Sequence, residues 1–238
     1  MRERAAGSVA PAGGAAADID PLPADFYARP VLDVARDLIG CTVEHQDSSG
    51  VIVETEAYHD SEPACHAFVG LTARTRTLFG PPGRAYVYRS YGIHALLNAV
   101  CEPEGVGAAV LIRALEPLTG IAAMIARRGM NGGSAARERE LCSGPGKLTQ
   151  ALGVSLADND SSLQSGPIRI GPRREEWLAP QIVPGSRIGI SRALELPWRF
   201  CVVGNAHVSR PRPPVAGTLG RGRGRDGSTS ERARARAR

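Results

Sequence analysis

Two carboxylates stand two residues apart in the segment 51–58, which reads VIVETEAY. Apolar and polar residues alternate along it, as they do in a strand, and side chains two apart on a strand share a face. We therefore expect Ile52, Glu54, Glu56 and Tyr58 to point the same way. Two like charges in a partly enclosed place raise the proton affinity of one of them, which suits acid–base chemistry. The segment thus predicts a reactive carboxylate.

A histidine follows in ACHAF, eight residues after Tyr58. His66 brings an imidazole close to the carboxylates and the tyrosine, so this stretch is the first place to expect an active site. Taken alone, the residues leave two matters open. Either Glu54 or Glu56 could be the reactive acid, and Glu56 could instead form a structural ion pair with Arg113 of VLIRALEP.

The elements that would position these residues indicate an α+β class. The segment 30–40, PVLDVARDLIG, has a proline suited to a first turn, an apolar stripe and a closing glycine, which predicts a helix. Short turns between the apolar segments favour antiparallel neighbours over βαβ crossovers. Strands are expected at 51–58, 85–88, 93–100, 108–115, 187–191 and 198–203, and further helices from near Leu118 to the glycines at 129–133 and from Pro145. These elements predict a single domain with a curved antiparallel sheet and flanking helices.

Composition indicates a hydrophobic core that is stable without disulfides or structural metal ions. The chain has 238 residues, of which 42% are hydrophobic, and its five cysteines are scattered without a CxxC pair. Neither a zinc site nor a disulfide framework is spelled out, and no apolar run is long enough to span a membrane. We expect a soluble, cytoplasmic protein without metal or cofactor, associated with the nucleoid if the source is bacterial.

Charge is concentrated at one end. The formal net charge is +5, but residues 210–238 carry nine arginines against two acids, so the remainder of the chain is weakly acidic. The polar, small or arginine-rich composition of both ends predicts disordered tails at 1–24 and 210–238 around a domain at 25–209. Overall basicity therefore gives no argument that the folded part binds DNA. The tail could add salt-sensitive affinity for nucleic acid, or it could be an inert extension.

Four collinear motifs together carry a family resemblance. They are VETEAY with the following histidine, PGRAYVYRSYGIHALLN at 82–98, VLIRALEP at 110–117 and LCSGPGKLTQALG at 141–153. With PWRF at 197–200, they resemble the alkyladenine (3-methyladenine) DNA glycosylase family over residues 26–209. The resemblance implies a monofunctional DNA glycosylase of base excision repair. Such an enzyme flips alkylated or deaminated purines out of double-stranded DNA and hydrolyses the N-glycosidic bond with an activated water. It would leave an abasic site and act as a monomer.

The resemblance also assigns roles around the base. Glu56 would activate the water, and Arg113 would help to hold the water or Glu56 itself. Rings at Tyr58, His66 and Tyr88 would sandwich the flipped base. Asn98 would crowd the exocyclic amine of guanine, which makes it a selectivity residue.

Further roles concern the duplex. Tyr91, in the turn RSYG, would fill the gap that the flipped nucleotide leaves in the minor groove. Arg74, Arg76 and Lys147, with backbone amides of SGPGK, would contact DNA. The Tyr58–His66 loop is one residue shorter than is usual in the family, and Ser90 replaces a bulkier residue beside Tyr91. We expect these departures to affect which lesion fits the pocket and how readily it is flipped, and not the reaction itself.

Plainer interpretations stand beside these roles. A single tyrosine is most often core, Tyr91 could fold back over its hairpin, and Asn98 could be a polar residue on an exposed strand face. Arg74 and Arg76 could belong to a solvated loop. For the whole protein, two alternatives are a damaged-DNA-binding protein without glycosylase activity and a sugar hydrolase that uses Glu54 with Glu56.

Overall fold

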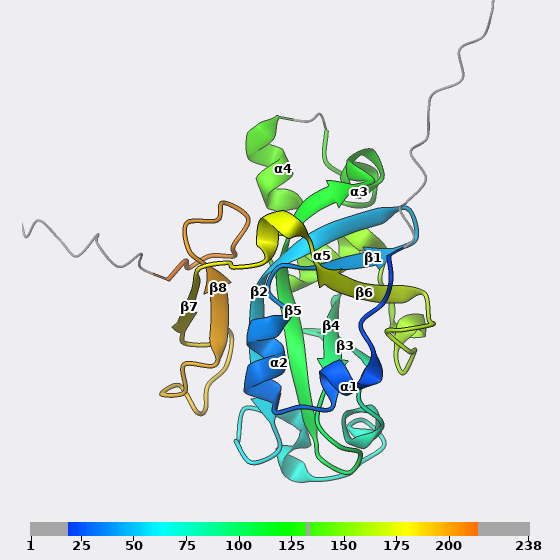
Figure 1. Ribbon diagram of the computed structural model, residues 1–238, viewed down its shortest axis with the longest axis vertical. Coiled ribbons are helices and arrows are strands. Elements are labelled where there is room, and N and C mark those ends of the chain that lie inside the picture. Colours follow the sequence, from blue (N-terminus) through cyan, green and yellow to red (C-terminus); the bar gives the residue numbers. More distant parts are fainter. Residues whose placement is uncertain (1–18, 132–133, 214–238) are drawn as a thin grey trace, which may run out of the picture.

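The computed structural model describes residues 19–131 and 134–213. Within these residues, eight strands form one antiparallel sheet in the order β3-β4-β5-β2-β1-β6, and β8 pairs with both β2 and β7. Figure 1 shows the long strands β2 and β5 side by side in the middle of the molecule, with α2 beside them and the β7–β8 pair to the left. Helices packed on an antiparallel sheet make this an α+β fold, as the sequence predicts.

The elements have the following bounds. The strands are β1 (Cys41–His45), β2 (Ser48–His59), β3 (Ala85–Ser90), β4 (His94–Val100), β5 (Ala108–Thr119), β6 (Ile168–Arg173), β7 (Ile182–Gly185) and β8 (Arg199–Val202). The α-helices are α1 (Ala24–Tyr27), α2 (Val31–Asp37), α3 (Ile121–Arg127), α4 (Ala135–Leu141) and α5 (Pro145–Leu152). Short 3-10 helices are η1 (His66–Val69), η2 (Arg76–Phe79), η3 (Leu156–Asp158) and η4 (Glu175–Trp177).

The ends of the described chain pack against the domain. Leu22 is buried and donates its N–H to the Ile170 carbonyl, while the Pro211 carbonyl accepts a hydrogen bond from Arg199. The described residues therefore reach beyond the expected domain of 25–209 on both sides. The rest of the two predicted tails, including most of the arginine-rich one, lies outside the described residues.

Strand β2 holds its carboxylates on a backbone that is paired along both edges. Glu54 and Glu56 lie opposite Ala114 and Leu111 of β5, and opposite Cys201 and Arg199 of β8. A strand with neighbours on both sides has its N–H and C=O groups engaged in the ladder, which makes it a rigid support.

The alternation expected from Ile52 to Tyr58 is wrong at its first position. Ile52 packs in the main core with Ala57, whereas Val53 belongs to a separate cluster beside β8. The pairing of β2 with β5 shifts register between Ile52 and Glu54, which is a β-bulge. An extra residue reverses which side chains face the core, so the carboxylates share a face with Tyr58 but not with Ile52.

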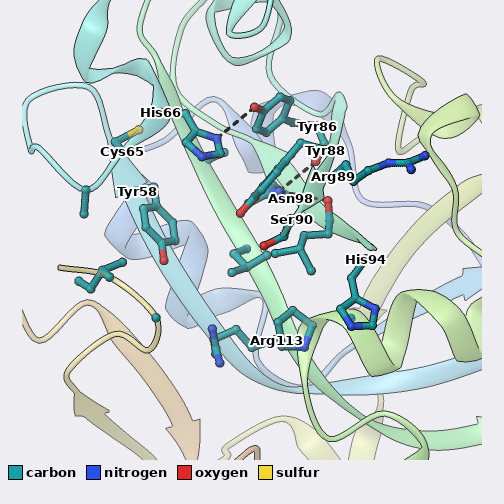
Figure 2. Close-up of a pocket in the computed structure, with 18 of the residues that line it drawn as sticks. Tyr58, Cys65, His66, Tyr86, Tyr88, Arg89, Ser90, His94, Asn98 and Arg113 are labelled. Carbon is teal, nitrogen blue, oxygen red and sulfur yellow. Dashed lines mark hydrogen bonds between the residues drawn. The ribbon is translucent and has the colours of Figure 1, made fainter. Parts of the chain in front are cut away.

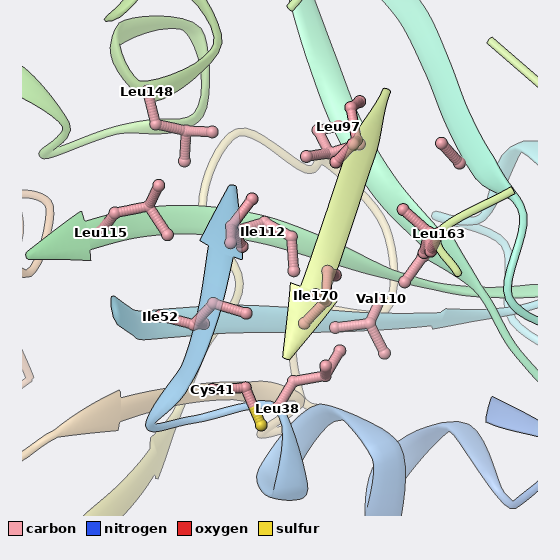
Figure 3. Packing of buried hydrophobic residues seen from close by; sticks show 14 of the residues in the cluster. Leu38, Cys41, Ile52, Leu97, Val110, Ile112, Leu115, Leu148, Leu163 and Ile170 are labelled. Carbon is pink, nitrogen blue, oxygen red and sulfur yellow. The ribbon is translucent and has the colours of Figure 1, made fainter. Parts of the chain in front are cut away.

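The main core lies between this sheet and its helices. Figure 3 shows Leu38 from the end of α2, Leu148 from α5 and Ile112 from β5 directed into one cluster with Ile52. Thr55, on the core face of β2, fixes α2 by donating from Oγ1 to the Ala35 carbonyl at 2.8 Å. Burial of these apolar side chains is the main favourable contribution to stability.

Two element boundaries differ from expectation. The helix expected near Leu118 begins later, as α3 at Ile121, because Thr119 still pairs with Ser49 and the two hydroxyls lie 2.8 Å apart. The strand expected at 187–191 is wrong, since these residues form a loop between β7 and β8. Gly189 has φ of 79° there and the Ile188 N–H leaves the sheet to reach a side chain, so neither residue can continue a ladder.

Two further features bear on chemistry. All five cysteines are free and buried. Among the described helices, none combines the length and the apolar character that crossing a membrane requires.

Candidate active site

A pocket of about 450 Å³ opens beside β2, β3 and β4. Its size falls within the range of ligand-binding clefts, ~300–1,000 Å³. Figure 2 shows Tyr58 and Arg113 on one side and His66, Tyr86 and Tyr88 above them, and the hydroxyl end of Tyr58 points toward Arg113. The predicted site residues that line it are Tyr58, His66, Arg74, Tyr88, Tyr91, Asn98 and Arg113. The pocket thus brings together most of the residues singled out in the sequence.

Aromatic rings form one wall of this pocket. The rings of Tyr86 and Tyr88 are stacked, with centroids 5.3 Å apart, and His66 meets Tyr88 edge-on at 4.6 Å. Such an arrangement presents flat apolar surface with polar edges. Tyr86, which the sequence interpretation left out, also lines the pocket and stacks against the predicted ring of Tyr88.

Glu56 lies directly behind the pocket wall and has no exposed surface. Its Oε2 accepts hydrogen bonds from the Tyr58 hydroxyl at 2.8 Å and from Arg113 Nη1 at 3.0 Å, and its Oε1 accepts one from the Ile188 N–H at 2.7 Å. All three donor residues line the pocket. An ionised carboxylate can accept about four hydrogen bonds, so Glu56 retains one position for a further donor.

Glu54, two residues earlier, accepts four hydrogen bonds from the protein. Its Oε1 accepts from Arg113 Nε at 2.9 Å, from Arg199 Nε at 2.7 Å and from the Ser209 hydroxyl at 2.8 Å, and its Oε2 accepts from the Ser209 N–H at 2.7 Å. Three of these bonds fall on Oε1, and two of the donors are guanidinium groups, so protein groups hold the carboxylate firmly. Glu54 therefore acts as an anchor for Arg113.

The two carboxylates also differ in proton affinity. Burial raises the pKa of Glu56 above its ordinary value, and this outweighs the opposing effects of Arg113, the Ile188 N–H and the Tyr58 hydroxyl. Burial also acts on Glu54, but there the guanidinium groups of Arg113 and Arg199 and the bonds from Ser209 prevail and hold the pKa below its ordinary value. Of the pair, Glu56 is the one suited to take up a proton.

His66 is held in one tautomer. Its Nε2 lies 3.2 Å from Arg74 Nη2, and its Nδ1 lies 3.1 Å from the Tyr86 hydroxyl. A guanidinium can only donate, so Nε2 accepts and the ring proton resides on Nδ1. Burial lowers the pKa of His66, and the positive charge of Arg74 lowers it further. His66 is therefore a neutral ring at physiological pH, and Arg74 reaches the pocket wall.

Tyr91 occupies the tip of the β3–β4 hairpin on the pocket rim. Its side chain is 87% exposed, and its φ of 49° lies in the left-handed region, followed by Gly92 at 72°. Two successive positive φ values with an Ile93 N–H bond to the Ser90 carbonyl describe a type I′ turn, which favours asparagine and glycine over an aromatic. The alternative in which Tyr91 folds back over the hairpin is wrong.

The remaining predicted residues lie at different depths. Asn98 is buried and donates from Nδ2 to the Tyr86 carbonyl at 3.0 Å, so the exposed-face alternative is wrong. Arg76 is exposed at the start of η2, and Lys147 is half-buried in the first turn of α5. Neither lines the pocket, although the two residues before Lys147 do.

Besides Tyr86, the sequence interpretation missed four residues that complete this site. They are Ile188 and Ser209, through their backbone N–H groups, and the arginines Arg187 and Arg199. The two arginines carried a signal, because each stands in an apolar segment where a buried charge needs an acidic partner. The described residues contain no cluster of three or more His, Cys, Asp or Glu side chains that could hold a metal ion.

Comparison with known proteins agrees with the motifs. The family model of methylpurine-DNA glycosylase (MPG) matches residues 25–206. A protein of Rhodopseudomonas palustris strain BisB18 is 55% identical over 190 residues, which cover 80% of this chain and 91% of its own length. One from Bradyrhizobium diazoefficiens is 52% identical, with 81% and 92% covered, and one from Methanoculleus marisnigri is 47% identical, with 79% and 98% covered. All three bear the name "Putative 3-methyladenine DNA glycosylase". The chain therefore belongs to the methylpurine-DNA glycosylase family and is a DNA glycosylase.

Proposed function

We propose that this enzyme is a monofunctional glycosylase that removes 3-methyladenine and related damaged purines from duplex DNA. The substrate follows from the name shared by its relatives. The damaged nucleotide rotates out of the base stack into the aromatic pocket. Glu56 deprotonates a water molecule that attacks the sugar carbon, and the enzyme leaves an abasic site.

One observation carries this proposal: Glu56 is buried, is held by three fixed donors beside an aromatic pocket, and keeps one acceptor position. A water that donates to this position would be fixed in orientation. Cleavage of the glycosidic bond develops positive charge on the sugar, and a carboxylate nearby stabilises that charge. Glu56 can thus serve both as base and as counter-charge.

Water is a better candidate for the nucleophile than an amine. The sequence contains a single lysine, Lys147, and it does not line the pocket. Glycosylases that cut the strand after base release form a Schiff base with an amine, which needs a lysine or N-terminal amine at the sugar. Hydrolysis without strand cleavage follows.

Leaving-group chemistry sets an order among substrates. A neutral base departs only if it is protonated, and two of the rings proposed to hold the base, His66 and Tyr88, are poor acids for that purpose. His66 is neutral with its Nδ1 proton directed at Tyr86, and burial raises the pKa of Tyr88 to about 12. A purine alkylated at a ring nitrogen already carries positive charge, so it leaves without being protonated. Methylated purines are therefore the preferred substrates, and neutral lesions such as hypoxanthine react more slowly.

Duplex DNA would be engaged around the pocket rim. The exposed ring of Tyr91 suits an apolar wedge that fills the space of the flipped nucleotide. Arg76 and Lys147, with the start of α5, supply positive charge for phosphates. The guanidinium of Arg74 faces His66. Its positive charge therefore acts both on the base pocket and on the phosphate backbone of the DNA.

The sugar-hydrolase alternative loses its support here. A pair of carboxylates acting on a glycoside needs both groups free to meet the substrate. Glu54 accepts from four protein donors, and its side chain is fully buried.

The test compares the wild-type protein with Glu56→Gln. Duplex DNA methylated by dimethyl sulfate is incubated with each protein and released base is measured, while single-lesion duplexes report alkali-labile sites. Glu44→Gln is the matched control, because Glu44 is also a buried carboxylate paired with an arginine, on β1. Glu56→Gln should keep lesion binding and lose activity by roughly a hundredfold or more. A wild-type protein that releases no base from any of these substrates would refute the proposal.

A further inference from the structure

A third buried arginine, Arg187, lies beside the site and donates to neither Glu54 nor Glu56. The Arg187 side chain has no exposed surface and forms a bidentate pair with Glu62, from Nη1 to Oε1 at 2.6 Å and from Nη2 to Oε2 at 2.9 Å. Nη1 also donates to the Ala57 carbonyl at 2.9 Å. Arg187 is therefore fixed to β2 at the residue directly after Glu56.

The same guanidinium supports the pocket from behind. Its Cζ lies 4.7 Å from the ring centroid of Tyr58 and 5.4 Å from that of Trp198. A planar guanidinium stacked on a ring restricts the motion of that ring. Tyr58 in turn donates its hydroxyl to Glu56, so the position of Arg187 reaches the carboxylate through one side chain.

A second route runs through the backbone. Ile188, the residue after Arg187, donates its N–H to Glu56 Oε1 at 2.7 Å. This contact comes from a loop between β7 and β8 and not from the sheet, so nothing in the ladder fixes its direction. The bonds of Arg187 to Glu62 and to the Ala57 carbonyl fix this loop at the residue directly before Ile188.

Glu62 is itself held in a second loop. Its Oε2 accepts the Ala64 N–H at 2.8 Å, and its own N–H bonds to the His59 carbonyl at 3.1 Å. This segment leads from the end of β2 to His66 on the pocket wall. The ion pair thus joins two loops that lie 125 residues apart in the chain.

We propose that Arg187 and Glu62 are a positioning pair for the glycosylase reaction: together they fix the two donors, the Ile188 N–H and the Tyr58 hydroxyl, that orient Glu56. The inference rests on the proposed function of Glu56. Neither member touches the substrate. Their effect is on the rate of base release, while binding of the lesion depends on the pocket rings and the rim.

A merely structural ion pair predicts a different outcome, because the two models differ in the sign of a pH effect. Removing the negative charge of Glu62 would, by charge alone, lower the pKa of Glu56. Loss of the Ile188 N–H bond would raise it. The charged and titratable groups that interact with Glu56 are Glu54, Tyr58, Tyr88, Arg113, Arg187 and Cys201. Substitution of Glu62 leaves all of them in the chain.

The first experiment uses Glu62→Ala in the full-length protein. Single-turnover base release from methylated duplex is measured against pH, and lesion binding is measured separately. We expect the rate constant at the plateau to fall about tenfold or more and the acidic limb to move up by about one pH unit. Binding should stay within about threefold, which is less than one lost aromatic contact would cost. Glu44→Ala is the control, since it removes a buried carboxylate from another Arg–Glu pair.

Arg187→Lys covers the case in which Glu62→Ala does not fold. Lysine keeps the charge, but a single ammonium cannot make both bonds to Glu62 and also stack on Tyr58. The rate should again fall about tenfold with binding retained. A wild-type rate in either folded variant overturns the inference, as does a loss of rate matched by loss of binding or a limb that moves to lower pH. An inactive wild-type protein would instead refute the proposed function itself.

Discussion

Glu54 and Glu56 share the guanidinium of Arg113 on one face of β2, yet only Glu54 also accepts from a second guanidinium, that of Arg199. Arg113 fixes both carboxylates, whereas the hydrogen bonds from the N–H and the hydroxyl of Ser209 reach only Glu54. This asymmetry divides the pair into an anchor and a reactive group.

Neutralising Glu54 should destabilise the protein far more than neutralising Glu56. The folded-state pKa of Glu54 lies below its ordinary value, so its contribution to stability is present at neutral pH and is lost as pH falls through that pKa. Glu54→Gln leaves Arg113 and Arg199 short of a partner and should lower the free energy of unfolding by about 3–5 kcal/mol. Urea unfolding at pH 7 measures this change.

Glu56→Gln should not destabilise the protein in this way. The folded-state pKa of Glu56 is raised, so its contribution to stability is present below the unfolded pKa and is lost as pH rises through the folded one. At neutral pH the buried charge is therefore a net cost, and a neutral amide should leave the free energy of unfolding within about 1 kcal/mol of wild type or above it. Equal large losses in both variants would contradict the division.

The rate of base release should show an acidic limb set by Glu56. A general base works only when deprotonated, so the rate falls as pH drops through its pKa, which burial raises above the ordinary glutamate value. Single-turnover measurements from roughly pH 3 to pH 8, a range that extends below the ordinary glutamate value of ~4.3, would locate the limb. A limb at or below that ordinary value would speak against Glu56 as the base.

Tyr91 should be needed for activity while adding nothing to stability. A non-glycine residue at φ of 49° costs roughly 1–2 kcal/mol, and the ring is 87% exposed. Tyr91→Gly should therefore leave the free energy of unfolding unchanged or raise it. Base release from paired lesions should slow, with a smaller effect in mismatched or single-stranded substrates, where flipping is easier. Equal slowing in all three substrates would exclude a wedge role.

Stacking by Tyr88 should depend on its ring and not on its hydroxyl. Tyr88→Ala should weaken lesion binding by ~1–3 kcal/mol, as for other base–aromatic contacts, whereas Tyr88→Phe should bind nearly as wild type. Leu78→Ala, a change in the small cluster that Tyr88 packs against, controls for loosening of the wall. Binding that is indifferent to Tyr88→Ala would remove it from the base pocket.

The arginine-rich tail can be tested by deletion, and the structure sets the cut. Deletion after residue 209 would remove Pro211, whose carbonyl accepts from Arg199, the partner of Glu54. Deletion after residue 213 spares this contact and removes seven arginines. If the tail contributes by counterion release, the salt dependence of DNA binding should become less steep. An unchanged slope would identify the tail as inert for binding.

Much of the central sheet could be predicted from the sequence, because it depends on local pattern. Alternation and short turns predicted β2, β3, β4 and β5 as strands of an antiparallel sheet, and the helix that begins after Pro30 was marked by its proline, stripe and glycine. Strands β1, β6 and β7 and helices α1 and α4 were missed. In the mixed segments CTVEH and AAREREL, neither period is strong, so tertiary pairing decides the structure.

The site could be predicted only in part, for a similar reason. Side chains near one another in sequence, such as Glu56 and Tyr58, were found together. The contact from Ile188 was not, because RIGIS has the composition of a strand and its use as a loop depends on a carboxylate 132 residues away. The bulge at Ile52 was equally hidden, since it arises from the pairing of β2 with β5.

The buried cysteines bear on how such an enzyme survives the chemistry it repairs. Agents that methylate purines also attack sulfur, and the reactive form of a cysteine is the thiolate. Burial raises the pKa of Cys41, Cys65, Cys142 and Cys201 to about 12, and that of Cys101 is raised as well. With all five cysteine thiols protonated and buried, the protein offers few thiolate targets to these electrophiles and should keep working while they damage the genome.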